Sequence, residues 1–491
     1  MVGSLLISLV LAETIARHLD GQPIFALSLL DGDGENATER DRDAVPVAAG
    51  VSPDWFFHDP PALPNRTKPP EKWVRLFWRV KTSPETFGQF RPFDLFKAFN
   101  SAYADDPCKN DLLRHSPERL YLLDLPGGER YPTYRFLPNA TTPLGLVTNQ
   151  IGWRGPPIEV PRAARTVRIV FVGASTTVGA HHLPFSYPEF IGPWLDEWAA
   201  SRHLDVHFET LNAGRESIDS HDIAAIVHNE VLPLRPDLVV YYEGANQFDM
   251  ATVVPEVPKG AAAHPTSSAE KTSPGLRFLS RYFDLARRIQ AAAGYAASDL
   301  DGREWPKPRY QLVWPEGLNE TDPDLSFRNL PVQLNDIQRD LDHMRSDLAT
   351  IGADFALSSF FRLAKDGMVL NPVRHRFILE DLNVSLYPFR YRDIERLTIF
   401  ENRVFAKYAL VHNLPFIDVA GGMPRNPDLL IDSIHATSGG VRVQAWVVLQ
   451  QLIPVVEKHL AAGDWPKPVP TDMPPLPTFV PRRISVDCPA P

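Results

Sequence analysis

The chain has 491 residues, of which 44% are hydrophobic and 22% charged, enough for two or three domains. Its formal net charge is -10 and no run of Lys or Arg occurs, so no basic stripe is available to follow a phosphate backbone and nucleic-acid binding is disfavoured. The two cysteines, Cys108 and Cys488, lie in no CxxC pair, which excludes a disulfide scaffold and cysteine-based zinc or redox chemistry. Whether the two pair with each other is left open.

The N-terminal stretch is apolar from residue 2 to residue 12 and is then interrupted by Glu13. It is shorter than a membrane span of about 20 residues, and it lacks a basic start and an A-x-A-like cleavage site. Two interpretations remain, a membrane anchor or signal segment over residues 1–20 and an amphipathic helix docked on the protein. We favour the anchor, which implies an extracytoplasmic protein with membrane association through its N-terminus.

The next two segments differ in composition. Residues 21–70 are rich in Asp, Gly and Pro, which predicts a linker. Residues 71–160 contain several aromatic runs, two of which flank a Pro-Gly-Gly at 126–128 and predict a hairpin. We therefore expect a small accessory region with strands ahead of the main domain.

From residue 161 to residue 463, short apolar runs alternate with helical patterns. Five strands are predicted, at 167–172, 206–212, 238–242, 354–360 and 415–419. Apolar residues at spacings of three and four predict helices over 330–351, 394–408 and 446–456. This alternation indicates an α/β domain with a mostly parallel five-stranded sheet covered on both faces.

Two Pro-rich segments stand outside that alternation. Residues 251–330 form an insertion with one helix predicted near 276–289, suited to a lid or a wall of the substrate site. Residues 464–491 form a tail, either an extended strap or a disordered end.

Candidate functional residues follow the predicted strands, where open parallel sheets bind ligands. Ser175 follows the first strand, Gly214 the second and Asn246 the third, while Asp432 and His435 follow the last. A serine hydroxyl attacks an acyl group only when a histidine removes its proton and a carboxylate orients that histidine.

We therefore assign Ser175 as nucleophile, His435 as base and Asp432 as the group that orients it. The expected oxyanion donors are the backbone N–H groups of Ser175 and Gly214 and the side-chain amide of Asn246. No P-loop and no G-x-G-x-x-G motif occurs, so nucleotide binding is disfavoured.

Ser, Gly, Asn and His in this chain order, with Asp three residues before His, resemble the blocks of the SGNH or GDSL-like hydrolase superfamily. The resemblance implies a three-layer α/β/α flavodoxin-like fold, serine esterase or acyltransferase activity, and no metal or organic cofactor. The segment "TNQIGWRGPPIE", from Thr148, resembles one that precedes the nucleophile in bacterial members with an N-terminal anchor. One departure is Ala174, where the family usually has the Asp of "GDS".

Other polar residues near these positions are expected to have structural roles, or are weaker candidates for the site. His221 is a rival base at a predicted helix start, and Asp249 is expected to be a loop residue. Asn212 is expected to secure the loop that carries Gly214. His181 and His182 either line the pocket or are solvated loop residues.

The functional hypothesis is hydrolysis of a carboxylic ester through an acyl-enzyme. A short acyl group such as acetate on a small molecule or glycan is the expected substrate. Two alternatives remain, an O-acyltransferase that uses the same residues and a non-enzymatic surface or binding protein with a degenerate site.

Overall fold

The computed structural model describes residues 2–19, 37–71, 135–180, 183–256 and 302–469 except 144, 372 and 373, and isolated positions between these ranges and beyond them. His181, His182, Cys108 and Cys488 lie outside the described residues, as do the tip of the predicted hairpin and most of the helix predicted at 276–289.

The central sheet has five strands, all parallel, in the order β4-β3-β5-β6-β7. Its strands are β3 (Thr166–Gly173), β4 (His207–Asn212), β5 (Leu238–Tyr242), β6 (Asp354–Ser358) and β7 (Phe416–Ile417). In the register, Ile169 of β3 lies opposite Leu238 of β5, which in turn lies opposite Asp354 of β6. Every residue of β3 and β5 is buried, as expected of strands covered on both faces.

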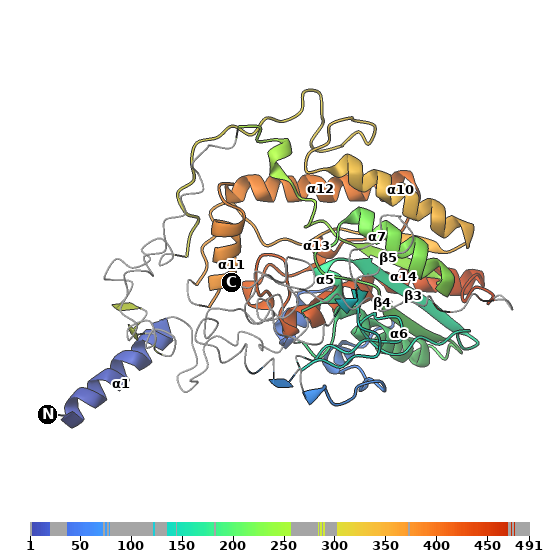
Figure 1. Cartoon of the computed structure of the whole chain (residues 1–491), viewed down its shortest axis with the longest axis horizontal. Helices are drawn as coiled ribbons and strands as arrows, with labels where there is room; N and C mark the ends of the chain where they lie inside the picture. The colour runs from blue at the N-terminus through green and yellow to red at the C-terminus, as the bar shows by residue number, and fades with distance from the viewer. Residues whose placement is uncertain are drawn as a thin grey trace, which may run out of the picture.

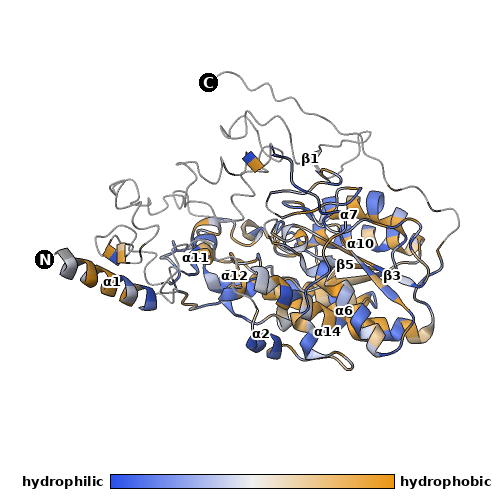
Figure 2. Ribbon diagram, turned by 90° about the horizontal axis from the view of Figure 1, so that it is seen from below, coloured by the Kyte–Doolittle hydropathy of each residue, from blue (hydrophilic) through white to orange (hydrophobic). Residues whose placement is uncertain are grey.

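Helices cover both faces of this sheet (Figure 1). Helices α6 (Tyr187–Ser201) and α14 (Ser438–Ala462) pack together on one face. On the other face lie α7 (Ser220–Ile226), α10 (Leu334–Thr350) and α12 (Tyr391–Val411). In Figure 2 the strands β3 and β5 lie between α7 and α10 above and α6 and α14 below. The predicted three-layer α/β/α fold is confirmed. The strand order reverses between β3 and β5, the place where such sheets bind ligands.

The remaining described elements are short. They are α2 (Glu39–Asp43), η1 (Pro53–Phe57), β1 (Tyr121–Leu122), β2 (Arg135–Phe136), α5 (Ser175–Val178), η3 (Val227–Val231), η4 (Leu232–Leu234), η5 (Met250–Thr252), α11 (Arg376–Glu380), η7 (Asp381–Ser385), α13 (Val419–Gly422) and η8 (Pro427–Leu429). Strands β1 and β2 pair antiparallel on the two aromatic runs that flank the Pro-Gly-Gly.

The last two strands are shorter than predicted because side chains take over their backbone groups. After β6, the backbone N–H and C=O of Phe360 bond to the side-chain amide of Asn402 on α12. After β7, the Asp418 carboxylate accepts the N–H of Gly421 and begins helix α13.

Segments on either side of the main domain pack against it. Phe56, fully buried, contacts the Trp446 ring of α14 at a centroid distance of 5.6 Å, so part of the expected linker lies on the domain. Trp465, at the start of the Pro-rich tail, is buried and donates from Nε1 to Asp354 at 2.9 Å. The first tail residues therefore form a strap at the amino-terminal edge of the sheet.

Helix α1 (Val2–Leu19) extends away from the domain (Figure 1). Several of its apolar side chains are exposed, among them Ile7 at 71% and Val10 at 65%. Among the described residues, no helix combines the length and the hydropathy that a membrane span requires. The anchor interpretation stays a prediction.

Candidate active site

Ser175 lies on a tight turn between β3 and the short helix α5. A Cβ at Gly173 would lie 2.2 Å from both Thr177 Oγ1 and the Tyr242 carbonyl oxygen, so this close approach requires glycine. Ser175 is the first residue of α5, so its backbone N–H has no acceptor within the helix. Ala174, the departure from "GDS", is fully buried.

The structure brings Ser175, His435 and Asp432 together from segments 260 residues apart. The Ser175 Oγ lies 2.9 Å from His435 Nε2. The opposite ring nitrogen, Nδ1, lies 2.8 Å from Asp432 Oδ2 and 3.0 Å from Oδ1. Ser175 and His435 are each 8% exposed. These contacts are those that activation of a serine hydroxyl by a carboxylate-oriented imidazole requires.

The surroundings of Asp432 keep its carboxylate ionised. Burial favours the neutral acid, but it is outweighed by the adjacent His435 imidazole and by hydrogen bonds from the backbone N–H groups of His435 and Ile434. Together these lower the pKa of Asp432 to about 2. The carboxylate therefore stays charged and available to His435 Nδ1.

The loop that carries His435 is fixed at several points. The backbone N–H of Leu363 donates to the Ser433 carbonyl at 2.7 Å, and the Ser433 hydroxyl donates to Asp381. The loop ends at Thr437, whose hydroxyl accepts the N–H of Gly440 and begins helix α14. These bonds hold the imidazole at the end of a long, buried helix.

The expected oxyanion donors Gly214 and Asn246 already have acceptors within the protein. The backbone N–H of Gly214 donates to Asn212 Oδ1 at 2.9 Å. The exposed Asn246 amide donates from Nδ2 to the Ile218 carbonyl at 2.7 Å, which leaves its second amide hydrogen for another acceptor. The Gly214 N–H can therefore serve an oxyanion only by sharing with, or leaving, Asn212.

A cluster of buried ionisable side chains lies next to Asn246, and the sequence pattern did not predict it. Glu243 Oε1 accepts the backbone N–H groups of Ala245 and Asn246, both at 2.7 Å. Glu401, from α12, is fully buried, and burial and the charge of Glu243 raise its pKa well above the ordinary range. Burial raises the pKa values of both carboxyls, and the Arg362 guanidinium, which lies over the Phe248 ring at 4.6 Å, offsets part of that effect. The only sequence signal is the position of Glu243, directly before the "GAN" block.

The rival candidates have other partners. His221 Nδ1 lies 3.6 Å from Asp340 on α10, and Asp249 accepts the N–H of Ala251 at the start of η5. Asn212 accepts the Gly214 N–H, so it secures that loop as expected. In the part of the chain that the structure describes, no group of three or more His, Cys, Asp or Glu side chains is arranged to hold a metal ion.

Comparison with known proteins gives only distant likeness. No protein-family model matches the chain, and no curated protein sequence does. Axe2, an acetylxylan esterase from Geobacillus stearothermophilus, is 14% identical with a TM-score of 0.31, over 58% of this chain and 94% of its own. A lipase/acylhydrolase from Enterococcus faecalis is 15% identical with a TM-score of 0.31, over 59% of this chain and 96% of its own. Likeness at these levels does not identify the reaction of this chain.

Proposed function

We propose that the chain is a serine hydrolase of the SGNH type that cleaves carboxylic esters through an acyl-enzyme. The single observation that carries this proposal is the continuous contact from Ser175 Oγ through the His435 ring to the Asp432 carboxylate, at 2.9 and 2.8 Å. The ionised state of Asp432 supports it, because a charged carboxylate stabilises the imidazolium that forms during attack.

The reaction has two halves. His435 Nε2 takes the proton of Ser175 as Oγ bonds to the ester carbonyl carbon, and the resulting oxyanion accepts hydrogen bonds from the Ser175 N–H and the free amide hydrogen of Asn246. His435 then gives the proton to the leaving alkoxide, which departs as an alcohol. Water, deprotonated by His435, attacks the acyl-enzyme in the same way and releases the carboxylic acid and Ser175.

We propose a short acyl group, such as acetate on a glycan, as the substrate. Ser175 and His435 are each 8% exposed, and this low exposure favours a small acyl group over a bulky one. An extracytoplasmic location and attachment through α1 accompany this proposal, and a fusion of residues 1–25 to a reporter tests them.

The test is a series of p-nitrophenyl esters from C2 to C12, with the wild type, Ser175→Ala and a matched control. Ser201→Ala is that control, because Ser201 lies exposed at the far end of α6 and its hydroxyl donates to the Trp198 carbonyl of the same helix. We expect Ser175→Ala to lose at least about 10³-fold in kcat. Ser201→Ala should match the wild type, with C2 the best substrate.

Equal rates for the wild type and Ser175→Ala would contradict the nucleophile assignment. Adding a soluble glycan acceptor separates hydrolysis from transfer, because acyl transfer that exceeds hydrolysis would show that a sugar hydroxyl replaces water as the second nucleophile.

A further inference from the structure

The segment "TNQIGWRG", residues 148–155, folds into a tight turn beside the catalytic edge of the sheet. The Asn149 Oδ1 accepts the backbone N–H groups of Ile151 and Trp153 at 3.2 and 3.0 Å. Gly152 has a φ of +81°, and a Cβ there would lie 2.3 Å from the Phe136 carbonyl oxygen, so the turn requires glycine. The turn leaves Trp153 and Arg154 buried, at 1% and 2% exposure.

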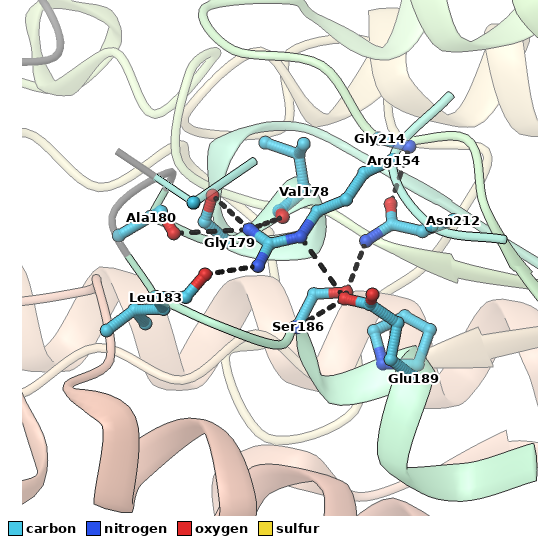
Figure 3. Close-up of polar contacts among 12 residues, drawn as sticks. Arg154, Val178, Gly179, Ala180, Leu183, Ser186, Glu189, Asn212 and Gly214 are labelled. Atoms are coloured by element: carbon cyan, nitrogen blue, oxygen red, sulfur yellow. Dashed lines mark hydrogen bonds and ion pairs between the residues drawn. The ribbon is translucent and has the colours of Figure 1, made fainter. Parts of the chain in front are cut away.

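Arg154 binds the loop that follows the nucleophile helix (Figure 3). Its Nη1 donates to the carbonyls of Val178, Gly179 and Ala180 at 3.0, 3.3 and 3.1 Å. Its Nη2 donates to the Leu183 carbonyl at 2.8 Å. Carbonyls at the end of a helix lack intrahelical partners, so the guanidinium caps α5 and fixes the chain leaving it.

A relay of hydrogen bonds continues from Arg154 to Gly214 (Figure 3). Arg154 Nε donates to Glu189 Oε2 at 3.2 Å, and the same oxygen accepts the Ser186 hydroxyl at 2.6 Å. The Ser186 Oγ in turn accepts from Asn212 Nδ2 at 2.9 Å, while Asn212 Oδ1 accepts the Gly214 N–H.

Asn212 also ties this relay to the helix that begins with Ser175. Its Nδ2 donates to the Thr177 carbonyl at 2.8 Å. A Cβ at Gly214 would lie 2.5 Å from the Val178 backbone nitrogen, so the glycine loop rests directly on the same short helix. One network thus reaches both sides of the proposed catalytic centre.

Trp153 adds a second, parallel connection from the same turn. Its Nε1 donates to Glu230 Oε2 at 2.7 Å, and Glu230 accepts from Arg215 at 2.5 Å. Arg215 directly follows Gly214 in the chain, so two adjacent residues of the turn support the nucleophile loop and the glycine loop.

We propose that Arg154 and Asn212 are positioning residues that hold the short helix carrying Ser175 and its backbone N–H in place for attack, with the Gly214 loop packed against that helix. This inference rests on the proposed function. The region before the main domain thereby completes the catalytic centre. Neither residue reacts with substrate; each acts through the backbone groups that it holds, and misplacement of about 1 Å is enough to cost about 100-fold in rate.

The chain provides a matched control for Arg154. Arg168 is equally buried and lies on β3, the strand that leads to Ser175, but near the opposite end of the sheet. Its guanidinium donates to the Leu234 carbonyl at 2.8 Å, to the Glu159 carbonyl and to the Glu209 carboxylate. Replacement by Lys removes the planar fork from either site and leaves the charge.

The experiment compares Arg154→Lys, Asn212→Asp and Arg168→Lys with the wild type. Thermal unfolding, kcat and KM for p-nitrophenyl acetate, and the rate at which a fluorophosphonate phosphonylates Ser175 are measured. In that labelling step, Ser175 Oγ bonds to phosphorus as fluoride leaves, and His435 takes the proton. Labelling also counts the sites in the folded fraction, which separates lost geometry from lost protein.

We expect all three variants to unfold at lower temperature. Per labelled site, Arg154→Lys and Asn212→Asp should lose about 10-fold to 100-fold in kcat and in labelling rate with KM nearly unchanged. Arg168→Lys should keep both within about 2-fold of the wild type. Added methylguanidinium should restore part of the lost rate to Arg154→Ala and none to Arg168→Ala.

Two results would overturn the inference in distinguishable ways. If the wild type is active and Arg154→Lys keeps its rates as Arg168→Lys does, the positioning role is wrong and the proposed function stands. If the wild type neither hydrolyses esters nor labels at Ser175, the proposed function fails and the positioning role fails with it.

Discussion

The two ends of the sheet treat buried charge differently. At the amino-terminal end, Asp237 is fully buried and both its oxygens are bonded: they accept from the Arg162 guanidinium, the Arg168 N–H and the Lys467 N–H. At the carboxyl end, Glu243 Oε2 and both oxygens of Glu401 are buried without a hydrogen-bond partner among the described residues.

This difference separates two uses of polar groups. A fully bonded carboxylate such as Asp237 leaves no oxygen without a partner, so its removal is strongly destabilising because the groups that it pairs stay buried. Buried carboxyls with unused oxygens cost stability, and groups of that kind gather where a site needs charges held close together. We therefore expect substitutions at the amino end to lower stability without changing rate. At the carboxyl end we expect substitutions of the catalytic groups to change rate, and removal of an unsatisfied carboxyl to raise stability.

The largest effect is expected for Asp432→Asn. The amide cannot stabilise an imidazolium and favours the wrong ring tautomer, so kcat should fall about 10³-fold to 10⁴-fold with little change in KM. Steady-state kinetics on p-nitrophenyl acetate measures it. Asp428→Asn is the control. Asp428 lies four residues before Asp432 and also pairs with a histidine, since one of its carboxylate oxygens is 2.7 Å from His375 Nε2.

The pH dependence of stability adds a second measurement on Asp432. Its folded-state pKa, about 2, is below the ordinary 3.8, so its contribution is complete above pH 4 and is lost as pH falls from 3.8 through 2. The wild type should lose stability relative to Asp432→Asn in that acid window. A difference in stability that stays constant as pH falls from 4 to 2 would contradict the assigned ionisation.

The next effect is expected for Asn246→Ala, which removes an amide donor from the proposed oxyanion site. Loss of one such donor costs about 10²-fold to 10³-fold in kcat. Gln247→Ala, at the neighbouring amide, should stay within a few-fold of the wild type although it removes an acceptor for the Ser220 N–H. Equal kcat losses in the two variants would show that loop integrity, not oxyanion binding, is being measured.

Asp237→Asn, at the amino-terminal end of the sheet, should lower stability and leave kcat unchanged. Removing the charge leaves Arg162 buried without its ion-pair partner, which typically costs about 3 kcal/mol or more in free energy of unfolding. Urea unfolding gives that value, and kcat per folded molecule should stay within about 2-fold. A tenfold loss of kcat would show that the amino-terminal end also governs the catalytic geometry.

Much of the fold could be predicted because its signals are local. The strands of the sheet are short apolar runs, and the helix faces repeat at three and four residues. The ends of β6 and β7 could not be predicted, because they depend on Asn402, 42 residues from Phe360, and on the Asp418 cap. A side chain that bonds to the backbone N–H or C=O at a strand end produces no periodic pattern in the sequence, so such an end cannot be read from it.

The candidate site divides in the same way. Ser175, Asp432 and His435 could be found because their chemistry requires particular residue types after predicted strands, Ser175 close after the first and the other two in the long loop after the last. The structure places them in contact. The sequence presents Arg154 only as part of a motif, since nothing local shows that its partners are carbonyls 24 to 29 residues away. Glu401 lies in the middle of an amphipathic helix, where a charged residue usually predicts a solvated face.

The smallest effect is expected for Glu401→Gln. It tests how much the two carboxyl oxygens of Glu401, buried without hydrogen-bond partners among the described residues, reduce the free energy of unfolding. Because the folded-state pKa of Glu401 is raised well above 4.5, its contribution to stability is greatest below that value and is lost as pH rises toward the folded-state pKa. The neutral amide has no such dependence, so Glu401→Gln should gain stability over the wild type as pH rises from 5 to 9. Thermal unfolding across that range measures the gain, with Glu395→Gln on the same helix as a part-exposed control. A constant difference would show that the Glu401 carboxylate is ionised in the folded protein and accepts hydrogen bonds there, and the two ends of the sheet would then handle buried charge alike.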